Sequence, residues 1–317
     1  MSKLSFPLLL GMLITAVAAE NDDPLMRAAG TREYRPPKET VETLATIEIG
    51  KNEGRLLNAT VFRPRVPPAG LMPAIVFIHG GGWRQGSHYN LFSAWMAERG
   101  YLVASIDYRL AKEAHWPAQI RDCKTGIRWL RSHAAEYHID PNRIGVWGTS
   151  AGGYLSACVG IMPDAPDLAG EGFEGVSSTV QAVAVFCGPT DFTGDWLKPG
   201  SPYPEVVINL LGVSREENPA LWKQASPAQQ VGSEAPPFLI VHGTDDTAVP
   251  FTQAEKLKLA LEAAGHSVEW LPVKNGHHDF FLNSTTPEST IQPNHETIMA
   301  TLLEFFDRHL KKSQSPE

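Results

Sequence analysis

The sequence predicts an α/β protein built on a mostly parallel, doubly wound sheet. Compact apolar runs recur along the 317-residue chain, and such near-continuous apolar strands are typical of parallel sheets that are buried on both faces. Amphipathic stretches alternate with these runs. In residues 117–137, for example, Ile120, Ile127 and Leu130 recur on one helical face. This alternation indicates one sheet with helices on both sides.

The predicted strands begin with an antiparallel hairpin, formed by residues 45–50 and 56–64 around the polar segment KNEGR. The later runs are expected to pair in parallel: residues 74–79, 101–108, 143–148, 181–188, 237–243 and 267–273. Helices are expected in residues 117–137, 252–265 and 296–312, and helical sequence also follows Gly153. We interpret the long Pro-rich segment 192–235 as helical excursions that form a small cap over the site.

One domain is predicted over residues 44–312, because no linker, low-complexity tract or internal repeat divides the chain. Residues 20–43 are interpreted as an N-terminal extension. The net charge is −8 and no basic cluster appears, so the chain would repel nucleic acid rather than gather it. We therefore exclude nucleic acid as a partner.

Residues 1–19 are predicted to be a secretory signal peptide. An apolar stretch from Phe6 to Val17 is followed by small residues at Ala18 and Ala19, as at a cleavage site. The apolar stretch is shorter than the roughly 20 residues that a membrane-spanning helix needs. We expect a secreted or periplasmic protein with no stable membrane insertion.

The chain has three cysteines, Cys123, Cys158 and Cys187, so at most one pair could form a disulfide. Their spacing matches neither a zinc site nor a CxxC motif. We favour three buried, unreactive thiols, and we expect neither a metal nor an organic cofactor.

A serine with the pattern of a nucleophile lies in GTSAGG, residues 148–153, between a predicted strand and a predicted helix. In the G-x-S-x-G pattern the serine occupies a sharp, strained turn that exposes its hydroxyl. Gly148 and Gly152 would be required because strand and helix nearly touch there. The alternative is a glycine-rich turn whose Ser150 caps a helix.

The glycines of HGGGW, residues 79–83, follow an early strand. A serine that attacks an ester creates a negative oxygen, which needs backbone N–H donors at close range. We expect Gly81, Gly82 and Ala151 to supply these donors as an oxyanion hole. A loop that merely needs positive φ would require fewer glycines. His79 is expected to brace this loop rather than to take part in the chemistry.

A serine hydroxyl needs a neighbouring base, and we select His278 in KNGHHDFF, between the last predicted strand and the last helix. His277 is the competing candidate. His278 is preferred because Phe280, two residues further on, can hold the loop against the protein.

The acid that orients this base is predicted to be Asp246 in HGTDDTAVP. Asp245 is interpreted as solvated, and Asp191, in FCGPTDF after the preceding strand, is the second candidate. The chain order serine, aspartate, histidine is the one found in α/β-hydrolases.

Other charged and aromatic residues receive structural interpretations. Asp107 and Arg109 are expected to pair with each other, and Arg121 and Asp122 to be surface charges of a helix.

Trp83 and Trp116 have two possible roles. Either could line the acyl or sugar pocket, because tryptophans often line concave sites, or both could serve ordinary packing. Trp83, next to the predicted oxyanion loop, is our candidate for substrate binding.

From about Leu44 onward, the chain resembles the α/β-hydrolase superfamily, and within it the exported carboxylesterases grouped with bacterial feruloyl and acetylxylan esterases. The most specific segments are HGGGW and GTSAGG. The others are DYRL (107–110), PAQIRDCKTGIRWLR (117–131), DPNRIGVW (140–147), GPTDF (188–192), SPAQQ (226–230), APPFLIVHGTDDTAVPF (235–251) and GHHDFF (276–281). The resemblance implies the α/β-hydrolase fold. It also places the catalytic serine, aspartate and histidine on Ser150, Asp246 and His278.

The resemblance further implies ester hydrolysis on plant-polysaccharide or related acyl esters. The sequence therefore predicts a serine carboxylic-ester hydrolase that forms an acyl-enzyme on small-molecule or polysaccharide esters, with short acyl groups such as carbohydrate acetates. The alternatives are a non-catalytic binding relative on the same fold, and a peptidase or lipase type of hydrolase. The presence of all three predicted catalytic residues argues against a purely binding role.

Overall fold

The computed structural model describes residues 38–162, 167–197, 203–280 and 290–311. The predicted signal peptide lies outside these ranges, as does all of the predicted extension up to residue 37. Within the described ranges, no helix combines the length and apolar character that crossing a bilayer requires.

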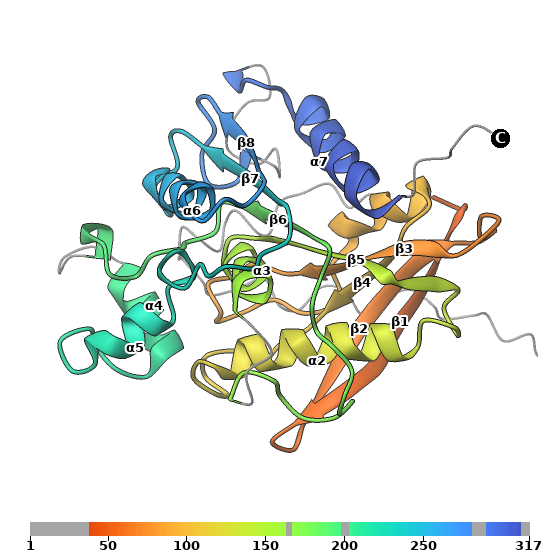
Figure 1. Cartoon of the computed structure of the whole chain (residues 1–317), viewed down its shortest axis with the longest axis horizontal. Coiled ribbons are helices and arrows are strands. Elements are labelled where there is room, and N and C mark those ends of the chain that lie inside the picture. Colours follow the sequence, from red (N-terminus) through yellow and green to blue (C-terminus); the bar gives the residue numbers. More distant parts are fainter. Residues whose placement is uncertain (1–37, 163–166, 198–202, 281–289, 312–317) are drawn as a thin grey trace, which may run out of the picture.

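One eight-stranded sheet forms the centre of the molecule, with the strand order β1-β2-β4-β3-β5-β6-β7-β8 (Figure 1). The pairs β1–β2 and β2–β4 are antiparallel, and all the other pairs are parallel. The strands are β1 (Val41–Asn52), β2 (Arg55–Pro64), β3 (Met72–Ile78), β4 (Leu102–Ile106), β5 (Ile139–Thr149), β6 (Ala182–Phe186), β7 (Phe238–Gly243) and β8 (Val268–Val273). The predicted class and the predicted parallel strands are confirmed.

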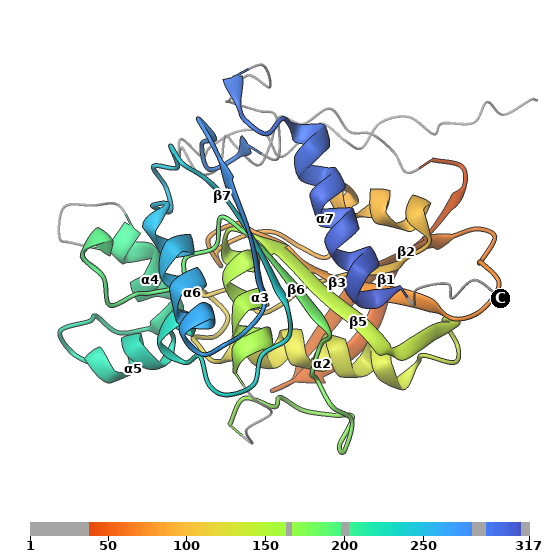
Figure 2. The ribbon, with the colours of Figure 1, turned by 45° about the horizontal axis from the view of Figure 1, so that its top comes forward.

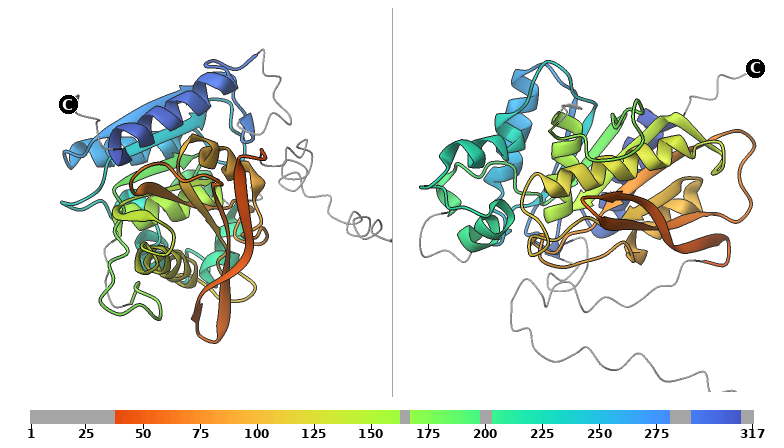
Figure 3. Two further views of the ribbon diagram at one scale, coloured as in Figure 1. Left: turned by 90° about the vertical axis from the view of Figure 1, so that its right-hand side faces the viewer. Right: turned by 90° about the horizontal axis from the view of Figure 1, so that it is seen from below.

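The predicted N-terminal hairpin is also confirmed, but it is longer than its apolar residues indicated. Asn52 pairs with Arg55, so the turn contains two residues, Glu53 and Gly54. Most of the residues that extend β1 are polar, such as Glu42, Thr43 and Lys51, and a search for apolar runs does not detect them. The hairpin appears as the long red-orange ribbon in Figure 3.

Helices cover both faces of the sheet, because successive strand residues point to opposite sides. On one face, Val76, Val146 and Ile240 pack with α2 (Ala118–Ser132), α3 (Ala151–Ile161) and α6 (Thr252–Ala263). On the other face, the neighbouring strand residues pack with α7 (His295–Leu310), which crosses the sheet in Figure 2. The 3₁₀ segment η1 (Leu91–Arg99) joins α7 there and was not predicted.

The predicted cap consists of short helices between β6 and β7. These are η2 (Asp195–Leu197), α4 (Tyr203–Leu211), α5 (Pro219–Gln224) and η3 (Pro227–Gln229). Helices α4 and α5, in teal, lie together at one end of the molecule (Figure 1).

The predicted pair Asp107–Arg109 is wrong. Arg109 forms an ion pair with Asp122 instead, at 2.9 Å between Nε and Oδ2, while Asp107 lies 3.1 Å from Arg55. Asp122 was expected at the surface, yet its side chain is fully buried. The β1–β2 hairpin packs over α2 from a distant part of the sequence, so the helix has less exposed surface than its own pattern indicates.

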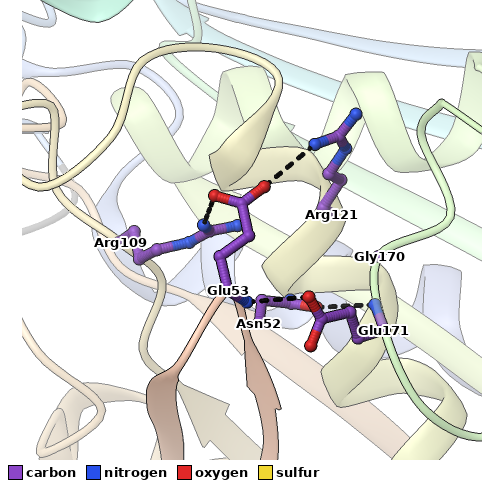
Figure 4. A pocket seen from close by; sticks show the side chains of 6 residues that line it. All are labelled: Asn52, Glu53, Arg109, Arg121, Gly170 and Glu171. Carbon is purple, nitrogen blue, oxygen red and sulfur yellow. Dashed lines mark hydrogen bonds and ion pairs between the residues drawn. The ribbon is translucent and has the colours of Figure 1, made fainter.

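Around this pair, charged residues from four segments line a pocket (Figure 4). One carboxylate oxygen of Glu53 forms an ion pair with Arg109 at 2.8 Å, and the other forms an ion pair with Arg121 at 3.3 Å. Asn52 donates to Asp122 at 2.6 Å. Burial raises the pKa of Asp122, and its bonds to Arg109 offset this only in part. The network ties the hairpin to α2 and to the segment after β4.

We expect Arg109→Met to destabilise the protein by about 3–5 kcal/mol, because it leaves the buried Asp122 carboxylate without its counter-charge. The matched control is Arg121→Met. Its ion pair with Glu53 is partly exposed, so its loss should cost about 1 kcal/mol or less. Urea unfolding of both variants measures the difference, and equal losses would contradict a special role for the buried pair.

Candidate active site

Ser150 occupies the turn between β5 and α3, with φ 55° and ψ −119°. This strained conformation was predicted and is confirmed. A Cβ on Gly152 would overlap the carbonyl oxygen of Ile78 at the end of β3, and a Cβ on Gly148 would overlap the backbone of Gly152. The predicted close approach of strand and helix is therefore confirmed, and it explains why both positions lack side chains.

The structure brings Ser150, His278 and Asp246 together from three loops. His278 Nε2 lies 2.9 Å from Ser150 Oγ, and His278 Nδ1 lies 2.7 Å from Asp246 Oδ2. Because an ionised carboxylate can only accept, Nδ1–H donates to Asp246. Nε2 is then free to accept the proton of the serine hydroxyl. This is the arrangement that a serine nucleophile with a histidine base requires.

The loops that carry these residues follow β5, β7 and β8, so all three lie beyond the carboxyl ends of parallel strands. Asp246 is buried, and its Oδ1 accepts hydrogen bonds from the backbone N–H groups of Ala248 and Val249 at 2.9 and 2.8 Å. Burial alone would raise the pKa of Asp246. The neighbouring His278 and His242, with their hydrogen bonds, instead hold it well below its usual range. The acid therefore stays ionised.

The competing candidates for the acid and the base have other partners than Ser150 and His278. Asp191 forms an ion pair with Lys256 at 2.6 Å and accepts from Thr193. Asp245 is exposed and accepts from the Thr244 hydroxyl. His277 is exposed, with its Nδ1 3.1 Å from the carbonyl oxygen of Asp245. Among the described residues, no hydrogen bond or ion pair joins Asp191, Asp245 or His277 to Ser150.

The glycine loop lies directly beside the serine. A Cβ on Gly80 would come within 3.4 Å of Ser150 Cβ. Gly81 and Gly82 both have positive φ, at 113° and 59°, and Ala151 is the first residue of α3, where backbone N–H groups have no acceptor within the helix. In the described part of the chain, the N–H groups of Gly81, Gly82 and Ala151 have no hydrogen-bond acceptor. They are available to an oxyanion.

His79 is placed to brace this loop, as expected. Its Nδ1–H donates to the Gly80 carbonyl at 2.7 Å, and its ring stacks on Tyr108 at 4.3 Å between centroids. The Tyr108 hydroxyl donates in turn to the His79 carbonyl. Burial lowers the pKa of His79 to about 4, so the imidazole is neutral at pH 7.

Trp83 is 3% exposed and contacts Tyr154 and Phe192 edge-on, at 5.2 and 6.0 Å between ring centroids. Trp116 is likewise buried. This burial and these ring contacts are typical of side chains packed in the core. A substrate-binding role for Trp83 remains a prediction.

Cap residues over the glycine loop were not identified from the sequence. Val206 of α4 has its Cγ1 3.5 Å from where a Cβ on Gly82 would lie. The helix is held from two sides: the backbone N–H of Trp116 donates to the Leu210 carbonyl at 2.8 Å, and the Tyr203 hydroxyl donates to the Thr247 carbonyl at 2.9 Å. Only the three-dimensional position of α4 reveals Val206.

Cys187 lies behind the candidate base, with its thiol donating to the His278 carbonyl at 3.3 Å. All three cysteines are buried and free. Potential ligand atoms of Cys187, Asp246 and His278 lie within 4.8 Å of one another. Burial raises the pKa of the Cys187 thiol well above its usual value, whereas a metal ligand must be a thiolate. His278 Nδ1 also already donates to Asp246. The cluster therefore does not fit a metal.

An eight-stranded, mostly parallel sheet with a serine at the turn after β5 defines an α/β-hydrolase. The chain belongs to the BD-FAE family, whose model matches residues 61–261.

Two esterases of Mycobacterium tuberculosis are similar to it. Esterase LipQ is 35% identical over 228 residues, which cover 70% of this chain and 54% of LipQ. Esterase LipC is 35% identical over 243 residues, covering 74% of this chain and 59% of LipC. The matched region thus spans little more than half the length of these relatives.

Solved structures match over nearly their full length. A truncated carbohydrate esterase from gut microbiota has a TM-score of 0.73 at 27% identity, covering 87% of this chain and 99% of its own. Esterase Est2 of Thermogutta terrifontis has a TM-score of 0.69 at 29% identity, covering 88% and 97%.

We expect the stability of the protein to fall as the pH drops from about 6.5 to about 4, with His79 as one cause. The unfolded chain takes up a proton near pH 6.5, whereas folded His79 resists protonation until its pKa of about 4. The difference corresponds to roughly 3 kcal/mol, fully present above pH 6.5 and lost towards pH 4.

Urea unfolding of wild type and His79→Phe across this pH range measures the contribution. The variant should lose less stability on acidification. If its pH dependence equals that of the wild type, folded and unfolded His79 take up the proton alike, contrary to this account.

Proposed function

We propose that the protein is a serine carboxylic-ester hydrolase that acts through an acyl-enzyme. The observation that carries this proposal is the hydrogen-bonded chain from Ser150 Oγ through His278 to Asp246. The names of the similar proteins support it, since LipQ, LipC and Est2 are all called esterases.

In the first half of the reaction, Ser150 Oγ attacks the ester carbonyl carbon while His278 Nε2 takes the hydroxyl proton. The carbonyl oxygen becomes negative and accepts hydrogen bonds from the N–H groups of Gly81, Gly82 and Ala151. Asp246 stabilises the imidazolium that has formed. The tetrahedral intermediate then expels the alcohol, whose oxygen takes the proton from His278, and the acyl group remains on Ser150.

In the second half, a water molecule attacks the acyl carbon and gives its proton to His278 Nε2. The new oxyanion accepts hydrogen bonds from the same three N–H groups. When the intermediate collapses, the carboxylic acid leaves and Ser150 Oγ recovers its proton from His278.

The proposed substrates are esters of short acyl groups, and carbohydrate acetates are the proposed natural class. One similar structure is a carbohydrate esterase, and Est2 structures have been solved with propionate and with butyrate bound. In this chain, Val206 Cγ1 lies 3.5 Å from where a Cβ on Gly82 would be, and we take this side chain as the one that limits the acyl group. The predicted export signal would bring the enzyme to polysaccharides and their fragments outside the cytoplasm.

Ser150→Ala should abolish turnover of p-nitrophenyl acetate and labelling by an organophosphate, without loss of folding. Asp246→Asn should lower kcat on the order of 10⁴-fold, because the base loses the acceptor that fixes its tautomer. The matched control is Asp191→Asn, at the acid paired with Lys256, which should lower kcat far less. Labelling at another residue, or greater damage from Asp191→Asn, would refute the assignment.

The kcat/KM for p-nitrophenyl esters should decline from C4 to C12, because each methylene that a pocket cannot hold costs roughly 1–3 kcal/mol. Val206→Ala should shift the profile toward longer chains, by about tenfold for C8 relative to C4. Ile208→Ala, on the same helix α4, is the control and should keep the wild-type ratio. An optimum at C8 or C12 in the wild type, with no acetate released from acetylated xylan, would contradict the proposed substrate class.

A further inference from the structure

A second histidine contacts the candidate acid from inside the protein. His242 lies near the end of β7, whose preceding residues, FLIV, are all apolar and buried. Its side chain is 1% exposed, and its Nε2 lies 3.2 Å from Asp246 Oδ2. This oxygen is the one that accepts the hydrogen bond of His278 Nδ1. The two histidines therefore share one carboxylate oxygen.

The hydrogen bonds of His242 show which of its two ring nitrogens carries a proton. Nε2 lies 2.8 Å from the carbonyl oxygen of Val249, and a carbonyl can only accept, so Nε2 carries a proton. In the described part of the chain, the buried Nδ1 has no hydrogen-bond partner. A proton on Nδ1 would be a buried donor without an acceptor, which is unfavourable. His242 therefore presents one N–H, from Nε2, to Val249 and toward Asp246.

This N–H also completes a closed arrangement around the acid. Val249 accepts from His242 through its carbonyl and donates through its N–H to Asp246 Oδ1. His242 thus holds the 246–249 turn and stands beside Oδ2, while the ring of Phe251 faces its imidazole edge-on at 6.0 Å. An unsatisfied nitrogen in an otherwise apolar strand is costly, so a histidine here requires a reason that packing does not give.

We propose that His242 is a positioning residue for the acid, one that holds Asp246 Oδ2 in place for His278 through its Nε2–H. This inference rests on the proposed function, because it assigns His242 a part in the same reaction. Among the described residues, His242 has no hydrogen bond or ion pair with Ser150 or His278. Its effect must therefore pass through Asp246.

The test compares His242→Leu with His242→Gln. Leucine removes the donor and keeps the volume approximately, whereas the Gln side-chain amide can place an N–H near the position of Nε2. Positioning defects of this kind cost on the order of 10- to 100-fold. We expect His242→Leu to lower kcat for p-nitrophenyl acetate in that range with little change in KM. His242→Gln should stay within about threefold of the wild type.

A double-mutant cycle locates the effect. In the Asp246→Asn background, His242→Leu should cause no further loss of kcat, because residues that act through one group are not additive. A wild-type kcat in His242→Leu would overturn the proposal. Equal damage by leucine and glutamine, or a further loss in the Asp246→Asn background, would also overturn it.

Thermal unfolding shows whether the variants fold. If His242→Leu does not fold, His242→Asn replaces it, because its shorter amide cannot reach the Nε2 position. The expected result is then a loss of kcat in His242→Asn but not in His242→Gln, and equal activities would refute the role. A wild-type protein without esterase turnover, or with turnover that survives Ser150→Ala, would instead refute the proposed function itself.

Discussion

The active-site geometry depends on how closely the start of α3 approaches the ends of β3 and β5. A side chain at Gly148 or Gly152 would collide with the backbone, so this junction tolerates nothing larger than glycine. The same contact forces Ser150 into its strained conformation and brings the first amide of α3 next to the glycine loop that leaves β3. One packing constraint thus positions both the candidate nucleophile and the candidate oxyanion donors.

The buried charge of Asp246 is the second constraint. Nearby hydrogen-bond donors compensate for the desolvation of its carboxylate. Two backbone N–H groups approach Oδ1, and two imidazoles approach Oδ2. These groups more than offset burial, so the pKa of Asp246 stays below its usual range. Three of these donors come from β7 and the turn after it, and the fourth, His278, comes from the loop after β8. The geometry around the acid can therefore be rigid.

Short-range sequence patterns predicted those features of the site that depend on residues adjacent in the chain. Ser150, Asp246 and His278 each follow a strand of a parallel sheet, so their meeting at one edge follows from the strand order. Arg109 and Asp122 were misjudged because the hairpin that buries them comes from residues far away in the chain. Val206 could not be found either, since its place over the loop depends on how α4 docks. His242 did leave a signal, a lone polar residue closing an apolar run four positions before Asp246.

Among the described residues, His79, His242 and His278 belong to the candidate site, and their environments differ. His79 is buried, and its lowered pKa keeps it neutral at pH 7. His242 is held by its bond to the Val249 carbonyl, and among the described residues its Nδ1 has no hydrogen-bond partner. His278 is 18% exposed and bonds Ser150 through the nitrogen that can receive a proton. The hydrogen bonds of His79 and His242 instead fix the glycine loop and the turn that carries the acid. In the proposed reaction, the Asp246 carboxylate stabilises the imidazolium that forms at His278 until the proton is passed on.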